Sequence, residues 1–266
     1  MGDTLLALLC AHLLADFLLQ TRTMIRRKHE LSMLLLHVLI VTGLSALLLG
    51  SSNPVVLLAI FASHFLFDWL KIRFCDNSAL PFILDQLAHL SVIVLIAITL
   101  PTTFAEGAWP TWLPPPLLDG YLLALSLVAG TVATVVAGGF LIEKLTAPLA
   151  REIMTSAPTS GDKAVAGTPD DGRSVPTDNP LPDGLTHGGK VIGWLERLLV
   201  LVLILADMAN GIGFLVVAKS IMRFGDIRDS GHRKLAEYII IGTFASFCWA
   251  LLVALPTRAA MLHYLP

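Results

Sequence analysis

Hydrophobic residues dominate seven long stretches of the chain, and most polar residues lie in the connections between them. Most of these stretches reach the roughly 17–25 residues that an α-helix needs to cross a bilayer. They cover residues 4–20, 31–49, 54–72, 81–100, 119–142, 191–218 and 238–256. The pattern predicts an all-α fold: a polytopic integral membrane helix bundle with about seven transmembrane helices.

The first four stretches break this pattern, because ionisable side chains recur inside them. Six of these residues form pairs four positions apart, and residues at i and i+4 lie one turn apart on one face of a helix. An ionisable residue at membrane depth costs about 2.5–3.5 kcal/mol on insertion scales, so it indicates a functional site by default. The pairs are His12/Asp16, His64/Asp68 and Asp85/His89, and His37 is the seventh member of the set.

The polar residues of these four stretches fall at a similar distance from one membrane face. Asp16 precedes Arg22 by six residues, and Asp68 precedes Lys71 by three. At a rise of 1.5 Å per residue, all four predicted helices place their polar groups within about 5–14 Å of the same face. Metal sites in helix bundles are built from side chains that point inward from facing helices. The four-helix front half is therefore predicted to hold one shared His/Asp pocket.

The composition supports a membrane protein. The 266-residue chain is 55% hydrophobic and 14% charged, and its mean hydropathy is +0.76. Soluble domains contain about 25% charged residues. The net charge of −2 gives no reason to expect a nucleic-acid partner. Membrane lipids are the expected partners, and a homo-oligomer remains open.

Residues 156–190 divide the chain into two membrane parts. Residues 156–189 are rich in Pro, Gly, Ser, Thr and Asp and contain no aromatic residue. Such a stretch buries too little apolar surface to offset its ordering entropy, so it predicts a flexible cytoplasmic linker. The membrane domain 1–155 then holds the pocket and five helices, and the C-terminal part 191–266 holds the last two helices.

The basic residues predict an orientation. Four of them lie between residues 22 and 28, and Lys71 and Arg73 follow the third stretch, whereas residues 101–118 contain no Lys or Arg. Under the positive-inside rule, the N-terminus is outside and the pocket lies near the cytoplasmic face of a bacterial inner membrane. The basic residues between 219 and 234 disagree, because they would lie outside if all seven stretches span.

The chemistry of the seven residues favours a divalent metal. Imidazole together with carboxylate suits Zn²⁺, with Mn or Fe as alternatives, and the set contains no cysteine. Seven candidate ligands exceed the needs of one ion, so either two ions are held or some residues orient the ligands by hydrogen bonds. Gln20 and Gln86 are candidates for such orienting contacts. Lys71 is placed to stabilise negative charge on a phosphate or carbonyl oxygen, although a snorkelling interfacial lysine is the alternative.

Two other interpretations of the same residues stay open. His–Asp pairs also hold membrane helices together without a metal, and ionisable groups in membrane helices are typical of proton or ion pathways. The clustering at one depth weighs against a pathway, because only Asp207 and Asn210, in the middle of the sixth stretch, would continue it.

Several segments resemble the DUF3307 family of bacterial membrane proteins, whose function is unknown. In the front half these are His12-Leu-Leu-Ala-Asp16-Phe-Leu-Leu-Gln20, His64-Phe-Leu-Phe-Asp68-Trp-Leu-Lys71 and Asp85-Gln86-Leu-Ala-His89. In the back half they are Ile192-Gly-Trp-Leu-Glu196-Arg197, Lys219-Ser-Ile-Met-Arg223-Phe224 and Glu237-Tyr238-Ile-Ile-Ile-Gly242-Thr243. The His/Asp helices are more loosely similar to membrane-bound metal-dependent hydrolases of the YdjM type, which implies a hydrolase by analogy.

The leading hypothesis is a metal-dependent hydrolase that acts on a lipid or another membrane-delivered substrate through a metal-activated water. The four histidines would be ligands, and Asp16, Asp68 and Asp85 would be ligands, orienting groups or the general base. The alternative is a divalent-cation or proton transporter or channel that uses the same residues.

Overall fold

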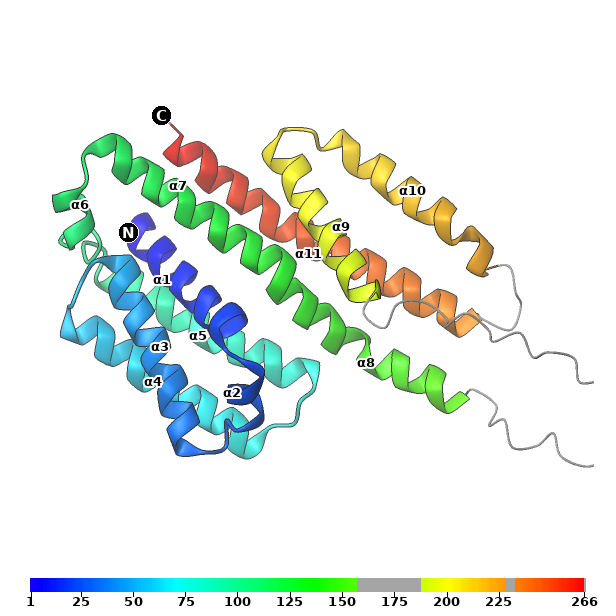
Figure 1. The fold of residues 1–266 in the computed structure, drawn as a ribbon, viewed down its shortest axis with the longest axis horizontal. Coiled ribbons are helices and arrows are strands. Elements are labelled where there is room, and N and C mark those ends of the chain that lie inside the picture. The colour runs from blue at the N-terminus through cyan, green and yellow to red at the C-terminus, as the bar shows by residue number, and fades with distance from the viewer. Residues whose placement is uncertain (157–187, 228–232, 266) are drawn as a thin grey trace, which may run out of the picture.

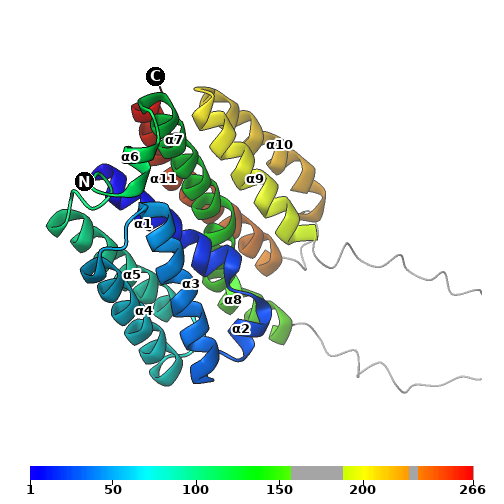
Figure 2. The same cartoon turned by 60° about the vertical axis from the view of Figure 1, so that its left-hand side comes forward.

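The computed structural model describes residues 1–156, 188–227 and 233–265, which form helices joined by short connections (Figures 1 and 2). In chain order the elements are α1 (Gly2–Leu14), the π-helix η1 (Ala15–Leu19), α2 (Arg22–Arg26), α3 (Leu31–Leu49), α4 (Pro54–Phe74), α5 (Ala79–Thr99), α6 (Ala108–Trp112), α7 (Pro115–Thr131), the π-helix η2 (Val132–Ala137), α8 (Gly138–Ser156), α9 (Gly188–Leu205), α10 (Asn210–Ile227) and α11 (Arg233–Tyr264). The described residues contain no β-strand, which confirms the all-α fold class. Of the predicted linker, residue 156 ends α8 and residues 188–190 begin α9; residues 157–187 lie outside the described residues.

Six helices in the described part of the chain are long and apolar enough to cross a membrane. They are Gly2–Leu19, Leu31–Leu49, Pro54–Phe74, Ala79–Thr99, Pro115–Ile153 and Lys234–Tyr264. The last two are 39 and 31 residues long. They exceed the roughly 20 residues that cross the hydrocarbon core, so their ends extend beyond it. The predicted polytopic helix bundle is confirmed, with these six in place of about seven.

The sixth predicted stretch, 191–218, is not one helix. It divides into α9 and α10, which lie side by side as a hairpin (Figures 1 and 2). Asp207 ends α9 with a φ of 60°, and the N–H groups of Asp207 and Met208 donate to the carbonyls of Ile204 (3.2 Å) and Leu203 (2.8 Å). This pair of hydrogen bonds is the Schellman pattern that terminates helices. The expectation that Asp207 and Asn210 lie in the middle of a membrane helix is therefore wrong.

Basic residues gather at one end of the bundle. Lys144 of α8 donates to the carbonyl of Asn77, between α4 and α5, at 3.1 Å. Lys234 at the start of α11 pairs with Glu152 near the end of α8 at 2.9 Å. We call this the basic end: it comprises connections 20–30 and 75–78, the C-terminus of α8 and the N-termini of α9 and α11 (Figure 1).

Both chain termini lie at the opposite end (Figure 1). The Tyr264 hydroxyl donates to Oδ1 of Asp3 at 2.6 Å, and the Thr4 hydroxyl donates to the carbonyl of Pro101 at 3.1 Å. The 100–114 connection at this end has no Lys or Arg. Because the α9–α10 hairpin returns the chain to the basic end, the predicted conflict with the positive-inside rule disappears for the described residues of 219–234.

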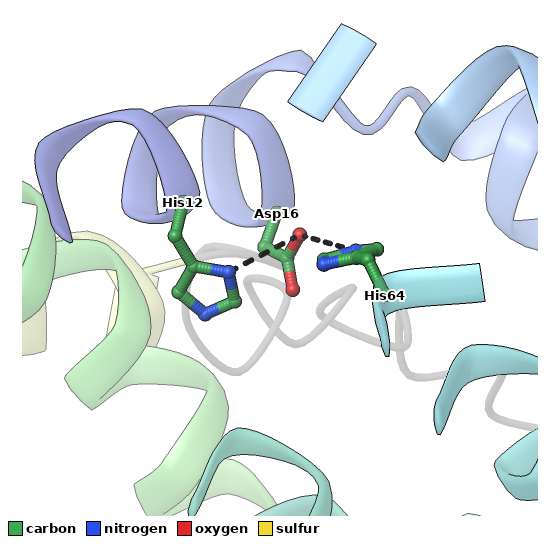
Figure 3. Close-up of side chains that lie close together, drawn as sticks. All are labelled: His12, Asp16 and His64. Atoms are coloured by element: carbon green, nitrogen blue, oxygen red, sulfur yellow. Dashed lines mark ion pairs between the residues drawn. The ribbon is translucent and has the colours of Figure 1, made fainter. Parts of the chain in front are cut away.

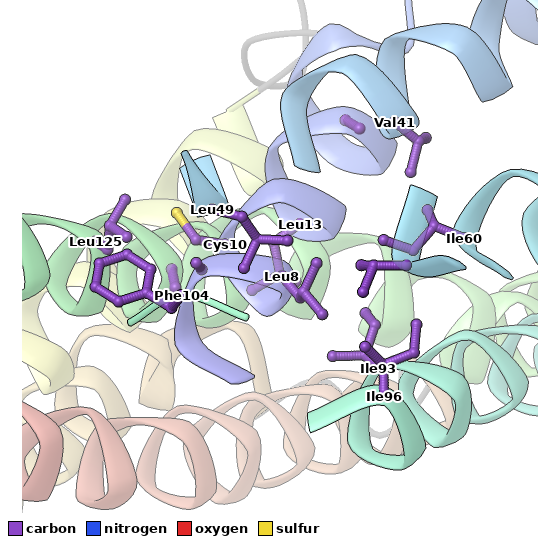
Figure 4. Packing of buried hydrophobic residues seen from close by; sticks show 14 of the residues in the cluster. Leu8, Cys10, Leu13, Val41, Leu49, Ile60, Ile93, Ile96, Phe104 and Leu125 are labelled. Atoms are coloured by element: carbon purple, nitrogen blue, oxygen red, sulfur yellow. The ribbon is translucent and has the colours of Figure 1, made fainter. Parts of the chain in front are cut away.

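Helix α1 lies at the centre of the front half. Its small residues Ala7 and Ala11 are fully buried, which lets neighbouring helices approach closely. Apolar side chains from α1, α3, α4 and α5 meet beside them (Figure 4). Four of these each lie four residues from one of the four histidines, on the side away from the basic end. We call them the apolar floor: Leu8, Val41, Ile60 and Ile93.

Candidate metal centre

The seven ionisable residues predicted from spacing converge near the basic end. They come from α1 (His12), η1 (Asp16), α3 (His37), α4 (His64 and Asp68) and α5 (Asp85 and His89). Six of them are at most 8% exposed, and the side chain of Asp16 is 10% exposed. Buried polar groups of this kind need partners, because water no longer satisfies them.

Two imidazoles and two carboxylates form the centre of the set. Nε2 of His37 and Nε2 of His64 are 3.1 Å apart. Oδ1 of Asp16 lies 3.3 Å from the His37 nitrogen and 3.4 Å from the His64 nitrogen. Oδ2 of Asp68 lies 3.6 Å and 3.7 Å from the same two atoms. We call Asp16, His37, His64 and Asp68 the four-ligand cluster.

The separations within the four-ligand cluster match the spacing of ligands around a small ion. Zinc bonds of about 2.0–2.1 Å at tetrahedral angles put neighbouring ligand atoms about 3.3–3.4 Å apart. Oδ1 of Asp16 and Oδ2 of Asp68 are buried and receive no well-directed hydrogen bond, although buried oxygens normally do. A cation among the four atoms would satisfy all of them, and these buried His and Asp groups could hold a metal ion.

The π-helix η1 positions Asp16. Figure 3 shows the Asp16 carboxylate between the rings of His12 and His64, and Nδ1 of His12 is 4.0 Å from Oδ1 of Asp16. Single-turn π-helices are frequent at functional sites. The helix ends at Leu19 and the backbone is extended at Gln20. Gln20 was predicted to orient a ligand, but among the described residues no hydrogen bond or ion pair joins it to the set.

Asp85 and His89 form a second group next to the four-ligand cluster. Nδ1 of His89 donates to the carbonyl of Asp85 at 2.8 Å, which leaves the Nε2 lone pair free. That Nε2 is buried without a hydrogen-bond partner, and the ring centroids of His64 and His89 are 4.1 Å apart. Asp68, Asp85 and His89 each offer a ligand atom, all within 4.8 Å of one another. The second group could therefore hold an ion together with Asp68.

Gln86 connects the two groups, as its predicted orienting role requires. Its side-chain oxygen lies 3.3 Å from Nε2 of His12. Its amide nitrogen donates to Oδ2 of Asp16 at 3.4 Å and to Oδ2 of Asp85 at 3.3 Å. One amide thus contacts an imidazole and two carboxylates, which fixes their mutual orientation.

The comparison with family models covers this part of the chain. Residues 4–115 match the DUF3307 family model. Its description is a protein of unknown function. The matched DUF3307 region includes every residue of both groups, whereas the motifs between 192 and 243 lie outside it. No curated protein and no solved structure matches the chain.

Two lysines of the DUF3307 region neutralise part of the carboxylate charge. Nζ of Lys71, predicted near the pocket, donates to Oδ2 of Asp85 at 2.6 Å. Nζ of Lys28 donates to Oδ1 of Asp68 at 2.9 Å and is 2.8 Å from Oδ2. Three carboxylates then face two ammonium groups, so neutral histidines leave one negative charge. A divalent cation complements that balance.

Sequence reasoning did not find Lys28 as a site residue. Lys28 belongs to the basic residues between 22 and 28, which predicted only the orientation of the protein in the membrane. Its partner Asp68 is 40 residues away in the sequence. Arg27 and Glu30 stabilise the loop that carries Lys28: Nε and Nη2 of Arg27 each donate to the Glu30 carboxylate at 2.7 Å. These hydrogen bonds hold the pKa of the Glu30 carboxyl below its usual range. The pair is exposed, and it connects the end of α2 to the start of α3.

Proposed function

We propose that this protein is a membrane metalloenzyme that hydrolyses a lipid or another membrane-delivered substrate. Its metal centre would lie near the cytoplasmic face of the bacterial inner membrane, because the basic end is expected inside. The observation that carries the proposal is the four-ligand cluster: two imidazole nitrogens and two carboxylate oxygens with separations of 3.1–3.7 Å.

The donor set favours zinc. Two imidazole nitrogens and two carboxylate oxygens suit Zn²⁺, and Mn²⁺ or Fe²⁺ is compatible with the same ligands. A second ion would use Asp68, Asp85 and His89. Asp68 would then belong to both sets of ligands, and sites for two metal ions are found in hydrolases.

A divalent ion in this centre would acidify a bound water and polarise the bond under attack. With one ion in the four-ligand cluster and none at the second group, His89 is placed to accept the proton, because its Nε2 is buried without a hydrogen-bond partner. Lys71 is placed to neutralise charge that develops on a phosphoryl or carbonyl oxygen, since its ammonium already lies 2.6 Å from Asp85. Hydrolysis then adds the water oxygen to the substrate, and the departing group takes up the proton.

The space around the histidines restricts how a substrate reaches them. A cavity of about 20 Å³ lies between the histidines and the apolar floor, lined by His12, His64 and His89 among others. It holds about one water molecule and no larger ligand. The substrate must therefore approach from the basic end, where the side chains of Lys28 and Lys71 are 16% and 29% exposed.

A divalent-cation or proton transporter remains the alternative, with a His–Asp network without metal as the third interpretation. Transport needs polar groups along the whole crossing. Beyond the histidines, however, the path meets the apolar floor of Leu8, Val41, Ile60 and Ile93. This layer favours a centre that retains its ion.

The metal content of the purified full-length protein tests the proposal. We expect one or two ions per chain by mass spectrometry. His64→Ala and Asp68→Asn should each remove most of the metal, and combining them should add little, because ligands of one ion act as a unit. His263→Ala and Asp76→Asn are matched controls, since both residues are exposed and outside the cluster.

Three outcomes would contradict the hydrolase. Less than about a tenth of an ion per chain, with no stabilisation by added Zn²⁺ or Mn²⁺, favours the structural network, since a bound ligand must stabilise the folded state. Metal uptake into proteoliposomes that depends on His64 favours the transporter. Bound metal without hydrolysis of any membrane phospholipid or acyl ester leaves only a structural metal.

A further inference from the structure

A large cavity lies outside the DUF3307 region, between α8, α9 and α11, with Lys219 of α10 on its wall. Its volume is about 730 Å³, which falls within the range of ligand sites in proteins. Its wall contains residues of all three back-half motifs, among them Glu196 and Arg197, Lys219, and Tyr238 and Gly242. These motifs are far apart in the sequence, and the helix hairpin brings them to one place.

Arg197 is the central charged residue of this cavity. It is 4% exposed, and Nε and Nη2 donate to the carbonyl of Val135 at 3.2 Å and 3.1 Å. Nη1 donates to the hydroxyl of Ser246 at 3.1 Å. Val135 lies within the π-helix η2, and its carbonyl also accepts a hydrogen bond from the N–H of Gly138. The guanidinium is thus held rigidly by neutral partners.

Among the residues that the structure describes, no carboxylate pairs with Arg197. A buried charge without a counter-ion is costly, and it is usually paired or bound to an ion of opposite sign. The neighbouring Glu196 is occupied by Lys219, whose Nζ lies 2.5 Å from Oε2. The three hydrogen bonds of Arg197 to two neutral acceptors leave two of the five guanidinium N–H groups for a further partner. An anion in the cavity would supply the counter-charge that Arg197 lacks among these residues.

The rest of the cavity wall favours an anion that carries apolar chains. Arg151 and Lys190 add positive charge, and with Lys219 and Arg197 they outnumber the two acidic residues, Glu143 and Glu196. Nζ of Lys190 lies over the rings of Phe140 and Trp194, 5.8 Å and 5.4 Å from their centroids. Apolar residues, including Ile142, Ile192 and Ile239, complete the wall. A headgroup and the start of an acyl chain would both find matching surfaces.

We propose that this cavity binds the phosphate of an anionic lipid headgroup from the leaflet at the basic end. Arg197 would bind the phosphate oxygens, which a planar guanidinium fits well. Lys190 would close the outer side of the headgroup. The proposal does not depend on the metal centre, which is made of other helices.

Lipid binding to the full-length protein tests this assignment. In nanodiscs of phosphatidylcholine, added phosphatidylglycerol should bind in preference, visible as retained lipid in native mass spectrometry and as a higher melting temperature. Lys190→Gln should weaken that binding about fivefold, the factor expected for one basic residue at an anionic surface. Arg197→Gln should abolish the preference. Lys144→Gln is the matched control, because Lys144 is at the same end but bonds to Asn77 outside the cavity.

The results distinguish a specific lipid-binding site from non-specific attraction of anionic lipids to basic side chains. Equal losses in Lys190→Gln and Lys144→Gln would overturn the proposal, because surface charge alone would then account for binding. Full competition by inorganic phosphate would assign the site to a soluble phosphate compound instead of a lipid. If Arg197→Gln does not fold, the comparison of Lys190→Gln with Lys144→Gln still decides.

Discussion

At the scale of single residues, Lys28 and a metal ion would compete for the same carboxylate. Nζ of Lys28 lies 2.9 Å and 2.8 Å from the two oxygens of Asp68, and Oδ2 is the oxygen that faces His37 and His64. The lysine therefore places a positive charge where it repels a cation. It also keeps Asp68 neutralised when no cation is bound, which limits the cost of burying that carboxylate.

Replacing Lys28 by Gln should raise the affinity for Zn²⁺ by about tenfold or more. Two unit charges 4 Å apart interact by about 4 kcal/mol at an effective dielectric constant of 20, and relaxation of the loop absorbs part of this. Competition with a chromophoric chelator measures the change. Arg27→Gln is the control, because its guanidinium pairs with exposed Glu30 and should leave the affinity unchanged. A lower affinity in Lys28→Gln would mean that Lys28 organises the site instead of opposing the ion.

Helical spacing predicted that the His and Asp side chains come together where regular helices carry them. The pairs His64/Asp68 and Asp85/His89 lie on regular α-helices, so the i, i+4 rule places each pair on one face. Helical spacing does not place Gln20, because it follows the π-helix η1 and its backbone is extended. Lys28 could not be found, since its contact with Asp68 depends on the path of a loop.

At the scale of elements, the main departure from the predicted fold is the turn between α9 and α10. The stretch 191–218 is apolar enough to look like one helix, and hydropathy does not report backbone direction. The sequence sign of this turn was Asp207, followed three residues later by Asn210. Asp and Asn tolerate the left-handed conformation better than other residues with a side chain. A left-handed residue ends the helix and lets the chain return.

Substitutions at Asp207 separate the backbone role of this residue from its charge. Asp207 pairs with Arg258 at 2.7 Å, but its side chain is 78% exposed, so the pair contributes about 0–1 kcal/mol. Asp207→Gly and Asp207→Val both lose the pair. Both variants must adopt φ near 60° at this position. Glycine does so without strain, whereas for valine this conformation costs roughly 1–2 kcal/mol. Thermal unfolding should therefore rank glycine near wild type and valine clearly below it. Equal melting temperatures would show that the turn does not stabilise the hairpin.

At the scale of the whole molecule, the α9–α10 hairpin leads the chain away from the basic end and back, so α11 begins at the basic end (Figure 1). The N-terminus and C-terminus then lie at the same end, joined by the Tyr264–Asp3 hydrogen bond. The residues of the candidate metal centre and of the proposed lipid site lie toward the opposite, basic end. Sequence reasoning placed the pocket at this end because four helices agreed in depth. It could not place the back half, because one misread turn reverses every later helix.

Cysteine labelling in intact cells and in inverted membrane vesicles tests this arrangement. Cys75 is exposed at the basic end and is a native probe, whereas Cys10 is buried and exposed Cys248 can be replaced by Ala. A membrane-impermeant maleimide should label Cys75 only in inverted vesicles, because the basic end is expected in the cytoplasm. Glu106→Cys and Met208→Cys, each made with Cys75→Ser, should be labelled from outside, since both positions are exposed at the opposite end.

If a single helix crossed at 191–218, Met208→Cys would lie within the bilayer and resist labelling from either side. Labelling of Cys75 from outside would instead reverse the orientation, and the proposed substrate would then have to arrive from the outer leaflet.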